Sequence, residues 1–241
     1  MKIKSTRYIY PPRPQSAIPR EAANQYADYG WIAQLKYNDA RALVKYLPSP
    51  TGNANDVPVE LWGRHGEKFR NYTTPEHLIT ELREVHKKLG LNPNEWSLLD
   101  GGLLDFKHEA IRDTIIIWDI LVKDGDHLTG TTYQSRYDII AAITNGDWYY
   151  HPPHGKHEPL NLGRRITDNI FMPINWPADT WDEAWDLVTR ANAPYIEKGK
   201  GPVLEGLVFK DSEGILENAW KEQNNSAWLG RSRVTTGRHA F

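Results

Sequence analysis

The most constraining feature of the sequence is the run Ile115–Val122, which reads IIIWDILV and contains one charged residue, Asp119. Side chains alternate between the two faces of a strand, so a run of successive apolar residues is apolar on both faces. A strand of this kind belongs at the centre of a sheet that is covered on both sides. The run is far too short to span a membrane. It therefore predicts the core of a globular protein, and no membrane association is expected.

Composition narrows the class of protein further. A length of 241 residues suits one large domain or two small ones, and 39% hydrophobic with 11% aromatic residues argues against disorder. Because the chain has no cysteine, disulfides, thiolate metal sites and cysteine nucleophiles are excluded. A net charge of −2 means that any contact with nucleic acid should be local. No apolar segment follows the first lysines, so we expect no secretory signal and a cytoplasmic (or phage-encoded, host-cytoplasmic) protein.

The pattern of predicted elements indicates an α+β fold with mainly antiparallel sheets and packed helices. Prolines 11, 12, 14 and 19 predict an extended lead-in over residues 1–25. The first two strands, separated by a short polar turn, are expected to pair as a hairpin. Helices are expected at 76–89, 133–144 and 179–193, and strands at 31–36, 41–47, 59–62, 98–104, 115–122, 203–210 and 228–234.

Two polar side chains stand out in the first of these strands. Gln34 and Lys36 share one face, opposite Ala33 and Leu35. A lysine at the end of a strand, just before a polar turn, can be partly desolvated, and a lowered pKa lets an amine act as a nucleophile. Taken alone, a lysine in this position is more often an ordinary exposed residue.

The order of short motifs along the chain favours a functional role for Lys36 over that of an ordinary exposed lysine. The series resembles the covalent nucleotidyltransferase superfamily, which comprises ATP-dependent DNA ligases, RNA ligases and mRNA-capping guanylyltransferases. The resemblance covers residues 30–234 and implies an ATP-grasp-like ligase adenylation fold. The motifs that carry it are Lys36 with Arg41 five residues later, Asp100-Gly101-Gly102-Leu103, Trp118-Asp119-Ile120-Leu121, the run EGLVFK from Glu205 to Lys210, and Trp228-Leu229 followed by Arg231 and Arg233.

The resemblance implies a role for each charged residue near the phosphates. Lys36 is expected to attack the α-phosphorus of ATP, which forms lysyl-AMP and expels pyrophosphate. Arg231 and Arg233 share a strand face and are expected to neutralise phosphate charge. Glu205 is expected to help hold a hard divalent metal ion, Mg²⁺ or Mn²⁺.

Other residues are expected to bind the rest of the nucleotide. Trp118 would stack on adenine, and Gln34 would accept a hydrogen bond from the adenine amino group through its side-chain carbonyl. Arg41 and Arg64 would contact ribose or the 5′-phosphate of the acceptor strand. Lys210 completes the expected nucleotide-binding set. Trp118 also fits an ordinary core aromatic in an apolar strand.

The sequence departs from the family pattern at three places. Asn38 and Asp39 stand where ligases have Asp-Gly, and Gly102 stands where they have a glutamate that usually faces the ribose. Asp39 would be strained if the turn needed a positive φ. The glycine at 102 leaves the ribose contact in doubt. In addition, Glu205 and Lys210 are an odd number of residues apart, so a regular strand would send them to opposite faces. Either the strand begins at Gly206, or only one of the two faces the site.

These observations predict a polynucleotide ligase that seals 5′-phosphate and 3′-hydroxyl ends, with DNA slightly favoured. The expected organisation is one nucleotidyltransferase domain over residues 1–241, monomeric, without a C-terminal OB-fold. Its partner is nicked or broken nucleic acid, DNA or RNA. The alternatives are an RNA ligase of the same chemistry, a GTP-dependent capping enzyme, and a catalytically silent domain that binds nucleotide or nucleic acid.

Overall fold

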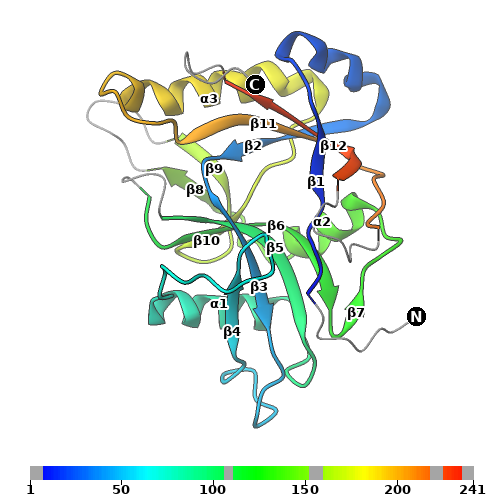
Figure 1. Cartoon of the computed structure of the whole chain (residues 1–241), viewed down its shortest axis with the longest axis vertical. Coiled ribbons are helices and arrows are strands. Elements are labelled where there is room, and N and C mark those ends of the chain that lie inside the picture. The colour runs from blue at the N-terminus through cyan, green and yellow to red at the C-terminus, as the bar shows by residue number, and fades with distance from the viewer. Residues whose placement is uncertain (1–7, 106–110, 152–159, 218–224, 235–241) are drawn as a thin grey trace.

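The computed structural model describes residues 8–105, 111–151, 160–217 and 225–234 and contains two β-sheets with helices packed against them (Figure 1). The smaller sheet has four strands in the order β1-β12-β11-β2. All of its pairings are antiparallel except that of β1 with β12. Its strands are β1 (Arg13–Ala17), β2 (Trp31–Tyr37), β11 (Leu204–Asp211) and β12 (Asn225–Arg233).

The larger sheet has eight strands, with the order β4-β3-β5-β6-β10-β9-β8 and with β7 paired to β6. Only the pairing of β10 with β6 is parallel. The predicted α+β architecture with mainly antiparallel sheets is therefore confirmed. The strands are β3 (Ala40–Tyr46), β4 (Val59–Trp62), β5 (Ser97–Leu104), β6 (Thr114–Lys123), β7 (Asp126–His127), β8 (Trp148–His151), β9 (Leu160–Arg165) and β10 (Ile170–Met172).

Helices cover the sheets with their apolar faces. Helix α1 buries Leu78, Leu82 and Val85 in a core shared with the larger sheet, and α3 buries Trp181 and Trp185 in a second core shared with β2 and β11 of the smaller sheet. None of the helices in the described ranges has the length and apolar character needed to cross a membrane. The helices are η1 (Arg20–Tyr29, 3₁₀), α1 (Glu76–Lys88), α2 (Tyr133–Ala141), η2 (Ala178–Thr180, 3₁₀) and α3 (Trp181–Ile196).

Strand β6 lies inside the larger sheet, between β5 and β10, as its apolar sequence predicts. Every residue of the strand is buried except Trp118 and Lys123. The buried Asp119 is neutralised by Arg136 of α2, whose Nε and Nη2 donate to its two carboxylate oxygens at 2.8 and 3.1 Å. A charge in the middle of a sheet core is thus compensated by a fork of two hydrogen bonds.

The expected hairpin of the first two strands is wrong. Strand β2 pairs with β11 in the smaller sheet, whereas β3 lies between β4 and β5 in the larger one. Because both edges of β3 are occupied, β2 has no place beside it. The dipeptide Asn38-Asp39 therefore carries the chain from β2 in one sheet to β3 in the other (Figure 1). Lys36 and Arg41 consequently belong to different sheets.

Residues 1–7 of the expected lead-in lie outside the described residues, and the part from residue 8 onward is more than an extended segment. Residues 13–17 are extended, but they form β1 at the edge of the smaller sheet, and residues 20–29 form helix η1. Ile9 and Ile18 are buried. Burial of these two side chains and coverage of the open edge of β12 explain why a proline-rich segment is incorporated in the fold.

Candidate functional site

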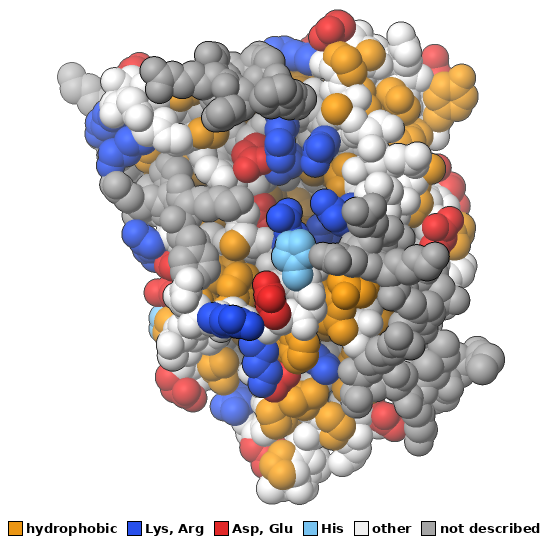
Figure 2. All heavy atoms as spheres, viewed as in Figure 1, with side chains coloured by type: hydrophobic (Ala, Val, Ile, Leu, Met, Phe, Trp, Pro, Cys, Tyr) orange, Lys and Arg blue, Asp and Glu red, His pale blue; other side chains and the backbone are white. Residues whose placement is uncertain are grey.

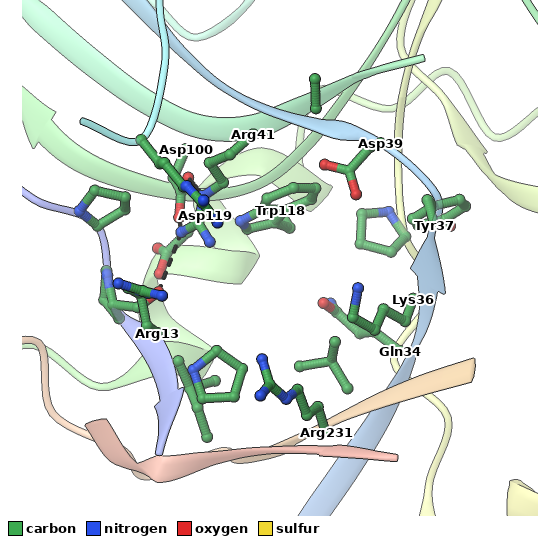
Figure 3. Close-up of a pocket in the computed structure, with 18 of the residues that line it drawn as sticks. Arg13, Gln34, Lys36, Tyr37, Asp39, Arg41, Asp100, Trp118, Asp119 and Arg231 are labelled. Atoms are coloured by element: carbon green, nitrogen blue, oxygen red, sulfur yellow. Dashed lines mark hydrogen bonds and ion pairs between the residues drawn. The ribbon is translucent and has the colours of Figure 1, made fainter. Parts of the chain in front are cut away.

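A cavity of about 530 Å³ lies between the two sheets. Strands β2, β11, β12 and β1 supply one wall, and β3, β5 and β6 supply the other (Figure 3). Figure 2 shows Lys and Arg side chains gathered in the middle of one face, over the space between the sheets. All the predicted site residues line this cavity: Gln34, Lys36, Arg41, Arg64, Trp118, Glu205, Lys210, Arg231 and Arg233.

Lys36 projects from the end of β2 into the cavity (Figure 3). Its side chain is 18% exposed, and its Nζ donates to Oε2 of Glu205 at 2.5 Å. Arg233 Nη2 lies 3.4 Å from the same oxygen. One carboxylate therefore holds both the candidate nucleophile and a neighbouring cation.

A bulge in β11 explains how Glu205 and Lys210 both line the cavity. Leu204 is opposite Tyr37 and Gly206 is opposite Lys36, so Glu205 is an extra residue on its strand. Gly206 has φ +136°, and a Cβ there would lie 2.1 Å from the carbonyl oxygen of Ser232. Glycine alone fits. Both alternatives drawn from strict alternation are wrong, because the bulge shifts the phase of the strand between the two residues.

Arginines surround the mouth of the cavity next to Lys36. Arg231 and Arg233 alternate with Ser232 on β12 and line the cavity together. Burial lowers the pKa of Arg231, and the positive charges of Arg233 and Arg13 lower it further. Cations crowded in this way form a site for an anion, because each one gains from a shared negative ligand.

Arg13 was not among the predicted site residues. It reaches the cavity from β1 and points toward the space that Arg231 also faces (Figure 3). The parallel pairing of β1 with β12 holds Arg13 in this position. The prolines on either side of Arg13 concealed this role, because they suggested a segment with no place in a sheet.

The opposite wall carries an aromatic ring and a fixed ion pair. Arg41 donates from Nε to Oδ1 of Asp100 at 2.5 Å and from Nη2 to Oδ2. Its guanidinium lies 5.2 Å from the ring centroid of Trp118. Trp118 is half-buried on an otherwise buried strand, and it lines the cavity. This is the position of a side chain that can stack on a planar ligand.

Gln34 and Lys210 form the deep end of the cavity. The amide nitrogen of Gln34 donates to the Tyr133 hydroxyl at 2.6 Å and to Oδ1 of Asn175 at 2.7 Å. These two bonds fix the orientation of the amide and leave its carbonyl oxygen as the group that a ligand can use. Lys210 is buried with Nζ 4.1 Å from the centroid of the Tyr133 ring, and burial lowers its pKa to about 7.

Arg64 lies at the rim. It is exposed, and its Nε donates to Nε2 of His65 at 2.8 Å in the turn that follows β4. Asp39 also lines the cavity, and its φ is not positive, so the aspartate in place of glycine is not strained. In the described parts of the chain, no three His, Asp or Glu residues gather closely enough to hold a metal ion by themselves.

Comparison with known proteins identifies this arrangement at the level of the fold. No protein-family model matches the sequence, and no curated protein matches it. Among solved structures, the ligase domain of M. tuberculosis LigD is similar over 93% of this chain, with 15% identity and a TM-score of 0.51. The chain has the fold of a ligase domain. A structure named Pmar-Lig_Pre is similar over 94% of this chain, with 18% identity and a TM-score of 0.51.

The similarity does not extend over the whole length of those proteins. This chain spans 59% of the LigD ligase-domain chain and 47% of the Pmar-Lig_Pre chain. At identities of 15% and 18% the likeness shows a shared arrangement of strands and helices. The chemistry has to be argued from the side chains in the cavity.

Proposed function

We propose that this chain is an ATP-dependent polynucleotide ligase, with DNA the favoured substrate, that acts through a lysyl-AMP intermediate at Lys36. The observation that carries the proposal is the position of the Lys36 amine, which faces a cavity of about 530 Å³ beside Glu205 and a group of arginines. An amine next to an anion site is the arrangement that transfer of a phosphorus group requires.

In the first step the Lys36 amine attacks the α-phosphorus of ATP. A nitrogen–phosphorus bond forms, the bond from the α-phosphorus to the bridging oxygen breaks, and pyrophosphate leaves with the electron pair. The amine must give up a proton, and Glu205 Oε2, at 2.5 Å, is placed to accept it. Arg231, Arg233 and Arg13 supply the positive charge that stabilises the phosphate oxygens.

The base and sugar would lie along the opposite wall. Trp118 offers a ring for stacking, and the Gln34 carbonyl oxygen accepts a hydrogen bond from an exocyclic amino group, which favours adenine over guanine at that position. Arg41 is held beside Trp118 by Asp100, and Arg64 lies at the rim. These two arginines can contact ribose or the 5′-phosphate of the nucleic acid.

A divalent metal fits this donor set. Magnesium is commonly bound through one or two carboxylates together with substrate phosphates, and Glu205 is a carboxylate beside the expected phosphate position. Glu205 would hold Mg²⁺ or Mn²⁺, which would supply charge neutralisation at the phosphates.

The nucleic-acid substrate completes the cycle. The AMP would pass from Lys36 to a 5′-phosphate, and a 3′-hydroxyl would then displace it to seal the strand. The stretch from Leu61 to Gly66 resembles DNA ligases, and the fold is that of the LigD ligase domain, which favours DNA. The positive side chains that would contact the nucleic acid are gathered around the cavity. Because such contacts to phosphates are screened by salt, the affinity for nucleic acid should fall steeply as the salt concentration rises.

The test is a mass measurement. The protein is incubated with ATP and either Mg²⁺ or Mn²⁺, and the expected result is a gain of one AMP that disappears in Lys36→Ala. Lys123→Ala, at the end of β6 away from the cavity, is the matched control and should keep the adduct. No adduct with either metal would contradict the proposal and favour a silent binding domain.

Nicked duplexes with DNA or RNA on the 3′-hydroxyl side then distinguish the two kinds of ligase, and GTP in place of ATP tests for capping chemistry.

A further inference from the structure

The side chain of Asp39 fills a place that a residue at position 102 would otherwise occupy. A Cβ added to Gly102 would lie 2.1 Å from Oδ2 and 2.7 Å from Cγ of Asp39, and its three nearest neighbours all belong to Asp39. Gly102 pairs with Arg41 across β3 and β5, so a side chain there would point to the same face as Arg41, toward the cavity. Positions 39 and 102 therefore compete for one place on the wall, and the carboxylate of Asp39 holds it.

This place lies between the two ends of the proposed nucleotide. Asp39 lies in the chain between Lys36 and Arg41, and the Arg41 guanidinium is 5.2 Å from the ring centroid of Trp118. Figure 3 shows the Asp39 carboxylate directed into the cavity. In a nucleotide with its base against Trp118 and its α-phosphate at Lys36, the ribose lies between them. The ribose presents two adjacent hydroxyl groups that donate hydrogen bonds, and a carboxylate can only accept them.

The negative charge of Asp39 also favours the ribose as its ligand group. A carboxylate in a cavity that takes a polyanion repels the phosphates, and it favours a part of the ligand that donates hydrogen bonds. The triphosphate has no donors at neutral pH, and the ribose hydroxyls are the nearest ones. We propose that Asp39 binds the ribose hydroxyls and makes the site select ribonucleotides over deoxyribonucleotides. This inference rests on the proposed function, since it takes the nucleotide and its direction from there.

The experiment compares nucleotides that differ only in the sugar. Adduct formation and equilibrium binding are measured with ATP, 2′-deoxy-ATP and 3′-deoxy-ATP. The wild type is expected to prefer ATP about tenfold to a hundredfold over at least one deoxynucleotide, the range for a hydrogen bond to a charged group. Asp39→Ala should bring the ratio close to one by slowing the reaction with ATP. Asp186→Ala, an exposed carboxylate on α3, should leave the ratio unchanged.

A pair of variants separates this role from a structural one. Gly102→Glu alone should slow the reaction, because the new side chain collides with Asp39. In the double variant Asp39→Gly with Gly102→Glu, both the carboxylate and the Cβ of residue 39 are removed, and a carboxylate from position 102 should restore part of the preference for ATP. An equal loss with all three nucleotides in Asp39→Ala, or an unchanged ratio, would overturn the assignment.

The two proposals fail in different ways. An adduct whose sugar preference does not depend on Asp39 removes only the ribose assignment. Absence of an adduct, with a preference for ATP in binding that Asp39→Ala abolishes, removes the ligase chemistry and supports Asp39 as the ribose contact. Absence of both, with no preference for ATP in binding, overturns both proposals.

Discussion

The two walls of the cavity treat charge in opposite ways. On the wall formed by the larger sheet, two aspartates each accept a two-pronged pair from an arginine: Asp100 from Arg41 of β3, and Asp119 from Arg136 of α2. On the smaller sheet Arg231 and Arg233 crowd together, and Glu205 is shared between Lys36 and Arg233. A buried matched pair is costly to break, because the remaining charge is left without a partner, whereas a surplus of one sign raises the energy of the fold until a ligand neutralises it. The difference therefore separates the wall that we propose orients the nucleotide from the wall that we propose reacts with it.

The largest effect is expected from breaking the buried pair on the larger sheet. Asp119→Ala leaves the Arg136 guanidinium, which is 0% exposed, without its carboxylate. The expected loss is about 3–5 kcal/mol in the free energy of unfolding, measured by urea denaturation. Asp105→Ala is the control, because its partner Arg112 is 55% exposed, and it should cost less than about 1 kcal/mol. Equal losses in the two variants would show that burial does not distinguish these pairs.

On the wall formed by the smaller sheet, we expect a substitution to lower activity without lowering stability. Arg231→Ala removes a cation that its neighbours repel, so the free energy of unfolding should change little, while adenylylation should slow about a hundredfold. Single-turnover rates and urea denaturation are measured on the same preparation. A large fall in stability with a parallel fall in rate would instead give Arg231 a structural role.

A smaller effect is expected from Arg13, at the edge of the same wall. Arg13→Ala should slow adenylylation about tenfold at low ATP concentration, because one charged contact to the phosphates is lost. Arg20→Ala is the matched control, since that guanidinium lies 5.0 Å from the Trp185 ring centroid on another surface. A rate for Arg13→Ala equal to that of Arg20→Ala would remove the N-terminal segment from the site.

The smallest effect concerns a buried polar group that neither wall uses. His86 on α1 is fully buried against Tyr46, and burial lowers its pKa. Below its ordinary pKa of about 6.5 the unfolded chain takes up a proton that the folded chain excludes, so stability should fall as pH drops. The slope from this group is less than about 1.4 kcal/mol per pH unit. His86→Leu should flatten the profile between pH 7 and pH 5, and an unchanged slope would assign it to other groups.

Much of the fold could be predicted from local sequence. The apolar run of β6, the alternation in β2 and the helical spacing in α1 and α3 identified these elements, because each carries its own burial pattern. Which strands pair could not be predicted in the same way. The separation of β2 from β3 and the parallel pairing of β1 with β12 depend on partners far away in the sequence.

Site residues that belong to a motif, or lie close to one, could be predicted from the sequence, and Arg13 could not. All the predicted site residues line one cavity, whereas Arg13, which also lines it, belongs to no motif. The bulge at Glu205 requires a glycine at position 206, but the sequence alone does not reveal this requirement. It follows from the closeness of the Ser232 carbonyl oxygen, which belongs to a strand far away in the sequence. Asp39 and Gly102 looked like two separate departures, and only the coordinates show that they share one place on the wall.

The most direct test of the account is to find which lysine carries AMP. Lys36 and Lys210 both line the cavity, and burial lowers the pKa of Lys210 to about 7. Geometry favours Lys36, because its amine shares the Glu205 carboxylate with Arg233. Lys210 is instead buried over Tyr133 and lies opposite Leu229. Peptide mapping by mass spectrometry after incubation with ATP should place the phosphoramidate on Lys36. An adduct on Lys210, or one that persists in Lys36→Ala, would contradict the account.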